Sequence, residues 1–134
     1  MLNDNKIAIV TGGAGFIGSH TVDLLLSKGY IVKVIDNLSG GHLDNIKHNI
    51  ENKNFLFKNA DINTISSQDP IFNNCNLLIH FAGLGDIVPS IDDPIKYMQT
   101  NLMGTINILE AARKNDIKRF VYAASSSCYG LAST

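Results

Sequence analysis

Glycines at a fixed spacing follow the apolar segment 6–11: Gly12, Gly15 and Gly18. An acidic residue, Asp36, ends the next apolar segment. A turn without side chains lets the backbone approach a pyrophosphate, and a helix that starts there offers free N–H groups and a partial positive charge. An aspartate at the following strand end can accept hydrogen bonds from both ribose hydroxyls and would repel a 2′-phosphate. The pattern predicts a dinucleotide site that prefers NAD to NADP.

Each glycine of this turn has its own place in the prediction. Gly12 allows the tight turn out of the strand, Gly15 leaves room for the pyrophosphate, and Gly18 lets the helix pack close to the sheet. The alternative interpretation is a strand–turn–helix corner that binds nothing. Because strand, glycines, helix and acid occur in the required order, we favour dinucleotide binding.

The elements that must position these residues alternate along the chain. Apolar runs predict strands at 6–11, 30–35, 54–58, 77–81 and 117–124, and the intervening segments predict helices at 15–28 and 94–114, with shorter helical pieces within 42–50 and 64–73. Such alternation is typical of an α/β fold with right-handed crossovers. We expect a Rossmann-like, doubly wound parallel sheet of order 3-2-1-4-5 over 1–134, incomplete at its C-terminal edge.

The segment 94–114 predicts the longest helix. Asp93 is a natural N-cap, and Pro94 fits the first helical position. Gly104 costs about 1 kcal/mol relative to alanine inside a helix, which indicates a close backbone approach there. Apolar residues recur at helical spacing and predict one buried face: Ile95, Met98, Leu102, Ile106 and Leu109.

Ligands of such sheets bind at the carboxyl ends of the strands, near the point where the strand order reverses. Separate parts of the chain reach that edge: the glycine turn, Asp36, Asp61, the segment 81–85 and Ser125. The topology therefore predicts that these residues lie around one site.

Composition excludes several other classes of protein. The 134 residues suffice for one domain, 45% of them are hydrophobic, and the net charge of −1 comes with no basic patch, so we expect no nucleic-acid partner. No apolar run reaches a membrane span, and the N-terminus lacks an apolar signal-peptide core. Cys75 and Cys128 are isolated, which favours a cytoplasmic protein with reduced thiols. The four histidines show no metal-ligand spacing, so we expect no metal.

With these residues in view, the chain resembles the extended short-chain dehydrogenases/reductases, and within them the NAD-dependent nucleotide-sugar epimerase/dehydratase family. Six motifs in order carry the resemblance: the G-x-x-G-x-x-G turn, Asp36-Asn37-Leu38, Asp61-Ile62, His80-Phe81-Ala82-Gly83, Asn101-Leu102-Met103-Gly104-Thr105, and Ala124–Gly130. The resemblance implies a 4-epimerase of carbohydrate metabolism or polysaccharide biosynthesis. Its substrate would be UDP-glucose and UDP-galactose, or an N-acetyl analogue.

The resemblance also implies the residues of the site. Ser125 matches the catalytic hydroxyl, because it lies four residues before the tyrosine of the Y-G pair; the alternative is a strand-end serine that caps loop N–H groups. Contacts to NAD are implied at Gly12, Gly15, Phe16, Ile17, Gly18, Asp36, Asn37, Ser39, Gly40, Asp61, Ile62, Phe81, Ala82, Gly83, Asn101 and Ser125.

The family's catalytic base is a tyrosine followed four residues later by a lysine, which lowers the pKa of the phenol. Tyr129 does not fit, because Ser133 stands where that lysine would be. We therefore expect the N-terminal part of such an enzyme, inactive alone, with its nucleotide-sugar substrate needing a C-terminal region beyond Thr134.

Family dehydratases need acidic residues just after the catalytic hydroxyl, where this chain has Ser126 and Ser127. That difference favours epimerisation. A dehydratase or reductase of the same superfamily and a non-catalytic dinucleotide-binding module stay open as alternatives. The resemblance further implies a homodimer formed through two helices, one of them 94–114.

Overall fold

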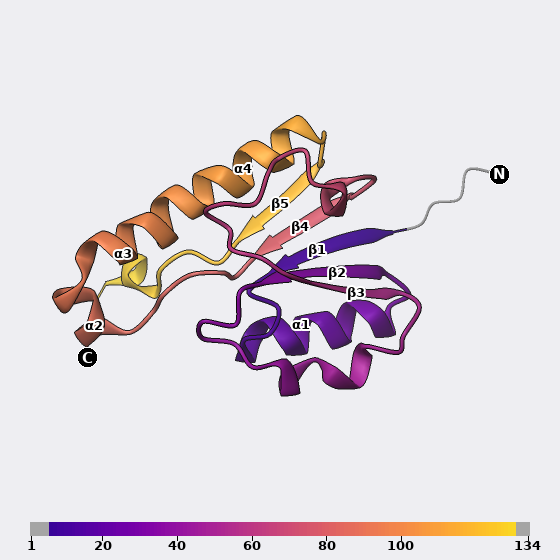
Figure 1. Cartoon of the computed structure of the whole chain (residues 1–134), viewed down its shortest axis with the longest axis horizontal. Helices are drawn as coiled ribbons and strands as arrows, with labels where there is room; N and C mark the ends of the chain where they lie inside the picture. The colour runs from indigo at the N-terminus through magenta and orange to yellow at the C-terminus, as the bar shows by residue number, and fades with distance from the viewer. Residues whose placement is uncertain (1–5, 131–134) are drawn as a thin grey trace.

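Five parallel strands form one sheet with helices on both faces (Figure 1). The computed structural model describes residues 6–130, apart from the side chains of Ser126 and Ser127. The strands are β1 (Ile7–Thr11), β2 (Ile31–Asp36), β3 (Phe55–Asn59), β4 (Leu77–His80) and β5 (Arg119–Tyr122). Their order is β3-β2-β1-β4-β5, which confirms the predicted 3-2-1-4-5 sheet.

The helices are α1 (Phe16–Ser27), α2 (Ile87–Asp92), α3 (Pro94–Met98) and α4 (Thr105–Lys114). Figure 1 shows α1 on one face of the sheet and α4 on the other. Ala8 and Val10 of β1 join the cluster under α1, whereas Ile9 joins the cluster that includes Ile108 of α4. Alternate residues of one strand thus enter two cores, which is why parallel strands are apolar on both faces.

The predicted long helix is a helical run in three parts. Asp93 caps it, because its carboxylate accepts a hydrogen bond from the Lys96 backbone N–H at 3.1 Å, and Pro94 follows at the first helical position. Between α3 and α4 the segment Gln99–Gly104 is π-helical. Single π turns inside α-helices occur frequently at functional sites. The N-cap prediction is confirmed, and the prediction of one continuous α-helix over 94–114 is corrected.

The prediction of the buried helical face was wrong. Small residues and one isoleucine face the sheet instead: Gly104, Ile108, Ala111 and Ala112 are buried. The predicted core residues are 45–69% exposed: Ile95, Met98, Leu102, Ile106 and Leu109. A Cβ on Gly104 would lie 2.6 Å from Ile62 Cδ1, so the predicted close approach exists at this position. Periodicity identifies an apolar stripe but not the surface that covers it.

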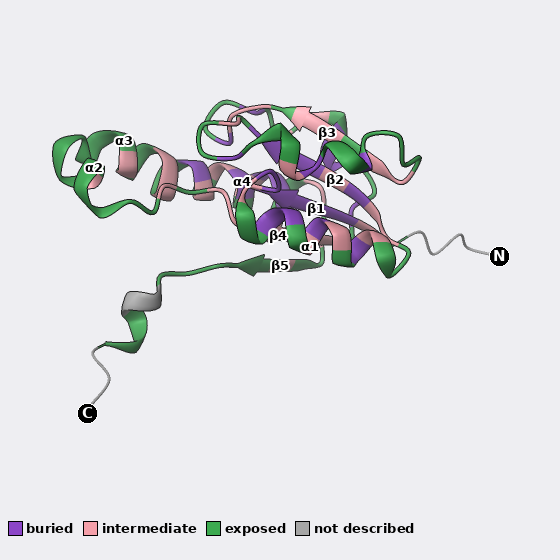
Figure 2. Ribbon diagram, turned by 90° about the horizontal axis from the view of Figure 1, so that it is seen from below, coloured by how far each residue is buried: buried purple, intermediate pink, exposed green. Residues whose placement is uncertain are grey.

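Other differences concern short elements. The segment 42–50 forms two 3-10 turns, Leu43–Asn45 and Lys47–Asn49, and 64–73 contains one more, Pro70–Phe72. Helix α2 is not predicted by the sequence pattern. Strand β5 is shorter than the predicted 117–124, and Figure 2 shows the exposed chain leaving the sheet after it.

Candidate functional site

The glycine corner joins β1 to α1. Gly12 has a φ of 68°, which L-residues with side chains rarely adopt, and a Cβ there would lie 2.7 Å from the Ala82 backbone nitrogen. A Cβ on Gly18 would overlap the Gly12 carbonyl oxygen. The predicted tight turn at Gly12 is therefore confirmed. The prediction for Gly18 is corrected, because the nearest backbone to Gly18 belongs to Gly12 and Gly13 of the corner rather than to the sheet.

Gly15 differs from the other glycines of the corner because the space beside it is open. A Cβ there would meet only the Gly12 carbonyl oxygen, at 3.3 Å. Gly15 is also the N-cap of α1, and no side chain caps that helix. The N–H groups of the first turn are thus available to an acceptor. The side chains of Phe16 and Ile17 are exposed and do not line the adjoining cleft, so only their backbone could contribute to it.

Asp36 connects two loops at the end of β2. One carboxylate oxygen accepts a hydrogen bond from the Ala14 N–H at 2.9 Å, and the other accepts from the Leu38 N–H at 2.8 Å. The residue is 8% exposed, and it lines the cleft. Because a carboxylate has about four acceptor positions, these two bonds leave capacity for hydroxyl donors of a ligand.

The loop after Asp36 is fixed on the glycine corner at Ala14. The Ala14 carbonyl accepts hydrogen bonds from the His42 N–H at 3.0 Å and from the Asn45 side chain at 2.8 Å. A Cβ on Gly41 would lie 2.8 Å from the Ala14 carbonyl carbon, so the contact requires glycine. This docking holds Ser39, Gly40 and the corner along one wall of the cleft.

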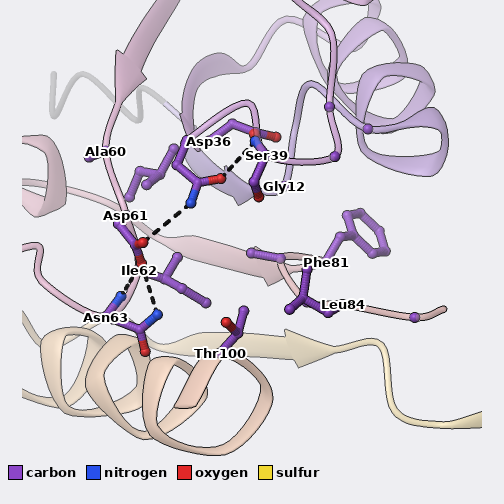
Figure 3. Close-up of a pocket in the computed structure, with 18 of the residues that line it drawn as sticks. Gly12, Asp36, Ser39, Ala60, Asp61, Ile62, Asn63, Phe81, Leu84 and Thr100 are labelled. Atoms are coloured by element: carbon purple, nitrogen blue, oxygen red, sulfur yellow. Dashed lines mark hydrogen bonds between the residues drawn. The ribbon is translucent and has the colours of Figure 1, made fainter. Parts of the chain in front are cut away.

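Asp61 forms the neighbouring wall after β3. One of its oxygens accepts the Asn37 side-chain amide at 3.3 Å, and the other accepts the Asn63 backbone N–H at 2.8 Å. Figure 3 shows Asp36 and Asp61 at the same cavity, with Thr100 approaching from the helical run on another side. The ends of β2 and β3 therefore converge as predicted.

Two adjoining hollows make up the cleft, with volumes of about 490 Å³ and about 380 Å³. They share Phe81, Ala82 and Gly83 of the loop after β4. Of the other predicted residues, the larger hollow contains Gly12, Gly15, Asp36, Asn37, Ser39, Gly40, Asp61 and Ile62. The smaller contains Asn101 and Ser125. Phe16, Ile17 and Gly18 line neither hollow.

Asn101 fastens the loop after β4 to the helical run. Its side-chain oxygen accepts the Leu84 N–H at 2.8 Å, and its amide nitrogen donates to the Leu84 carbonyl at 2.9 Å. A Cβ on Gly83 would lie 3.2 Å from the same side-chain oxygen. Asn101 thus determines the shape of the wall that the two hollows share.

Ser125 lies on the exposed chain that leaves β5, and it lines the smaller hollow together with Tyr122 and Thr105. Its carbonyl accepts the Cys128 N–H at 3.2 Å. The side chains of Ser126 and Ser127, on which the distinction from dehydratases depends, lie outside the described part of the chain.

Sequence reasoning missed several residues of the larger hollow. Ala60 and Asn63 follow β3, where the position at a strand end could have indicated them. Four more belong to the loop and helical run around α3: Asp86, Lys96, Gln99 and Thr100. Lys96 and Thr100 are one helical turn apart, so helical spacing would have placed them together once the facing side was known.

Across residues 6–130, no group of three or more His, Cys, Asp or Glu side chains could hold a metal ion. Within the same range, no helix has the length and apolar character needed to cross a membrane.

A family profile described as GDP-mannose 4,6 dehydratase matches residues 9–134. The UDP-glucose 4-epimerase uge1 of Schizosaccharomyces pombe is 40% identical over 127 residues, which are 91% of this chain and 36% of that protein.

Solved structures of UDP-sugar 4-epimerases also resemble this chain. A UDP-N-acetylglucosamine 4-epimerase from Methanobrevibacter ruminantium M1, in complex with UDP-N-acetylmuramic acid, superimposes with a TM-score of 0.86 and 33% identity over 94% of this chain and 40% of that one. A UDP-glucose 4-epimerase from Brucella ovis in complex with NAD superimposes with a TM-score of 0.81 and 34% identity. The match covers 96% of this chain and 38% of that one. This chain spans about two fifths of each relative. Because the profile covers nearly all of it, the chain belongs to the GDP-mannose 4,6 dehydratase family.

Proposed function

We propose that these residues form the NAD-binding domain of a nucleotide-sugar 4-epimerase that acts on UDP-sugars. The observation that carries the proposal is the connection between the uncapped glycine corner and Asp36 around one cleft at the carboxyl edge of the sheet. Open α/β sheets bind ligands at this edge. The relatives that are UDP-sugar 4-epimerases, one of them crystallised with NAD, support the same activity here.

The residues present fit a dinucleotide. The N–H groups at the start of α1 would face the pyrophosphate across Gly15, and Asp36 would accept the hydroxyls of one ribose. Asp61 and Ile62 would border the adenine, while the segment 81–83 with Asn101 would border the nicotinamide half. NAD supplies a hydride acceptor when it is bound. Gly12 and Gly18 would act indirectly, by giving the corner its shape.

Ser125 would donate a hydrogen bond to the reacting sugar oxygen from the smaller hollow. Its position beside the loop 81–85, which also lines the larger hollow, favours an enzyme over a non-catalytic binding module. Residues 1–134 contain no tyrosine with a lysine four positions later. We therefore expect the base to come from outside these residues, and a polypeptide of residues 1–134 alone to be inactive.

Calorimetry on the intact gene product tests the cofactor. We expect NAD to bind at least about tenfold more tightly than NADP, because the Asp36 carboxylate would face the 2′-phosphate. Asp44→Ala is the matched control, since Asp44 is an exposed aspartate that pairs with Lys47 at the surface. Equal or reversed affinities for the two cofactors would overturn the assignment.

Interconversion of UDP-glucose and UDP-galactose by the intact gene product tests the reaction. Ser125→Ala should lower kcat by about 100-fold, the lower range for a positioned group that shares in proton transfer. Ser90→Ala, in α2, should not. An intact protein that binds NAD but never interconverts either these sugars or their N-acetyl analogues would favour the binding-module alternative.

We also propose that the exposed apolar stripe of α3 and α4 packs against a second copy of the chain, as the family resemblance implies. The stripe that the sequence placed in the core is instead exposed, and a second copy could bury it. Light scattering should report a dimer for the intact gene product and a monomer after Leu102→Glu. Glu110→Gln, in α4 of the same helical run, is the control. A monomeric unmodified protein would refute the dimer.

We also propose a cytoplasmic location, on the basis of the two cysteines. Cys75 is buried and Cys128 is exposed, and both are free thiols. Free thiols are typical of reducing compartments. Fractionation of the source cells would test the location, and recovery outside the cytoplasm would contradict it.

A further inference from the structure

His80 ends β4 at the carboxyl edge of the sheet, and it is fully buried. β4 lies between β1 and β5 in the sheet, so the imidazole stands between the glycine corner and the chain that carries Ser125. Its ring stacks on Tyr122 with the centroids 5.7 Å apart, and Phe120 lies at 6.0 Å. The family resemblance includes His80 in the motif His80-Phe81-Ala82-Gly83 but implies no role for its imidazole.

Hydrogen bonds on one side of the ring determine where its proton is. The Thr105 hydroxyl lies 2.7 Å from the Asn101 carbonyl oxygen, and only the hydroxyl can donate in that pair. Its single proton is then in use, so at the 3.0 Å contact with His80 Nε2 the hydroxyl oxygen must accept. Nε2 therefore carries a proton.

The other side of the ring has the opposite polarity. His80 Nδ1 lies 2.6 Å from the Thr11 hydroxyl. In the neutral ring Nδ1 is then the acceptor, and Thr11 donates to it. The Thr11 oxygen in turn accepts the Ala82 N–H at 3.3 Å. These four hydrogen bonds form one chain in which every donor points the same way. It runs from Ala82 through Thr11, His80 and Thr105 to the carbonyl of Asn101.

The ends of this chain are parts of the cleft. Thr11 immediately precedes Gly12 of the glycine corner, Ala82 lines both hollows, and Asn101 holds Leu84 through two hydrogen bonds. The chain thus links the two loops that the proposed cofactor would bridge. It also connects Thr105, the first residue of α4, to Asn101 within the π-helical segment Gln99–Gly104.

We propose that His80 is a positioning residue: as a neutral imidazole protonated at Nε2, it couples the glycine corner to Asn101, so that both halves of the dinucleotide site are set by one hydrogen-bonded chain. The inference rests on the proposed function, since it names the residue that positions the NAD site. A doubly protonated ring would break the chain, because Nδ1 could no longer accept from Thr11.

Burial supports the neutral ring, because it lowers the pKa of His80 to about 4. Among the side chains that bond to the ring or pack on it, those of Thr11, Thr105, Phe120 and Tyr122, only the Tyr122 phenol is titratable. No carboxylate is among these contacts to hold a second proton on the imidazole. The single-tautomer chain is thus compatible with neutral pH.

The ring protonation is tested first, on the ligand-free intact gene product. Nitrogen-15 NMR of the labelled imidazole distinguishes a protonated ring nitrogen from a bare one. We expect a bare Nδ1 and a protonated Nε2 that persist at pH 5. The reverse tautomer, or titration at the ordinary histidine pKa, would overturn the proposed hydrogen-bonded chain through His80 whether or not NAD binds.

The coupling is tested by a double-mutant cycle on NAD affinity. Thr11→Val and Thr105→Val each remove one hydroxyl at constant shape, and each should weaken NAD by about tenfold, as expected for one lost hydrogen bond. The double variant and His80→Gln should lose little more than either single variant, because any one break disconnects the chain. Thr21→Val, in α1, is the control and should bind NAD normally.

A merely structural role gives a different result. It would lower the melting temperature of these variants but leave their NAD affinity, measured well below the melting temperature, unchanged. Alternatively, the fold-losses of the two single variants would multiply in the double variant. That result in a protein that binds NAD overturns the inference alone. Failure of the unmodified protein to bind NAD overturns the proposed function. The hydrogen-bonded chain through His80 is then judged by the NMR measurement of ring protonation alone.

Discussion

Replacing Asp36 with alanine should loosen the glycine corner even without a ligand. The carboxylate accepts the Ala14 and Leu38 N–H groups, and the residue is almost fully buried. Hydrogen bonds to a charged group contribute about 1.5–3 kcal/mol each, and truncation also leaves two backbone donors without an acceptor. Since water can reach Leu38 in part, we expect the free energy of unfolding to fall by about 3 kcal/mol, near the lower limit for two such bonds.

Chemical and thermal unfolding measure this change. A loss of that size should lower the melting temperature by about 10 °C for a domain of this length. Asp36→Asn keeps one acceptor oxygen but turns an NH₂ group toward the second backbone donor, so its loss should lie between those of the alanine variant and the control. The control is Asp44→Ala, whose side chain is 81% exposed and whose substitution should change stability by less than about 0.5 kcal/mol.

NAD affinity provides an independent readout of the same variants. Asp36→Ala should weaken NAD by about 10- to 100-fold, because it removes a ligand for ribose and also releases the loops at Ala14 and Leu38. An alanine variant as stable as Asp44→Ala would refute the view that this carboxylate holds the corner together. Unchanged NAD affinity in the folded variant would refute its role toward the ribose.

Substitutions at the glycine corner and at His80 should have distinct effects. Gly15→Val should abolish NAD binding yet leave the fold intact, because a side chain there enters the cleft, and calorimetry with circular dichroism checks both halves. Gly18→Ala should instead lower the melting temperature sharply, because its Cβ would overlap the Gly12 carbonyl oxygen. The pKa of His80 falls from 6.5 to about 4 on folding, so unfolding takes up a proton between these values. Stability should therefore decline as the pH falls from 6.5 to 4, by at most about 3 kcal/mol, and unfolding of His80→Gln should lack this slope.

The strand order and the edge where the site lies could be predicted from the sequence because both depend on local signals. Apolar runs identify strands, and alternation with helices leaves few possible topologies. The glycine spacing identified a corner whose φ at Gly12 has the expected form. These features follow from the chain's own steric limits, which a sequence expresses directly.

The orientation of the long helical run could not be predicted in this way. A stripe such as Met98, Leu102 and Ile106 predicts an apolar face, but burial depends on which surface reaches it. The buried side is that of Ile108 and Ala111, which pack in the cluster with Ile9 and Leu78 of the sheet, while Gly104 approaches Ile62 in the loop after β3. A rule that favours small residues next to a parallel sheet would have reversed the prediction.

The hydrogen-bonded partners of His80 were also beyond sequence reasoning. Thr11 and Thr105 are 69 and 25 positions away from it. They meet the ring only because β1 pairs with β4 and the helical run crosses the same edge. No local pattern reports such a triplet, whereas the strand register does so once the sheet is known.

The lining of the larger hollow has a consequence for how its occupant arrives. Three carboxylates, Asp36, Asp61 and Asp86, border it together with one ammonium group, Lys96. The excess is negative, and the pyrophosphate of a dinucleotide is negative too, so the long-range field around this mouth does not steer the ligand inward. Capture then relies on contacts that act only after arrival. Because dissolved salt damps repulsion beyond about 8 Å at physiological ionic strength, the association rate should rise, rather than fall, as salt is added.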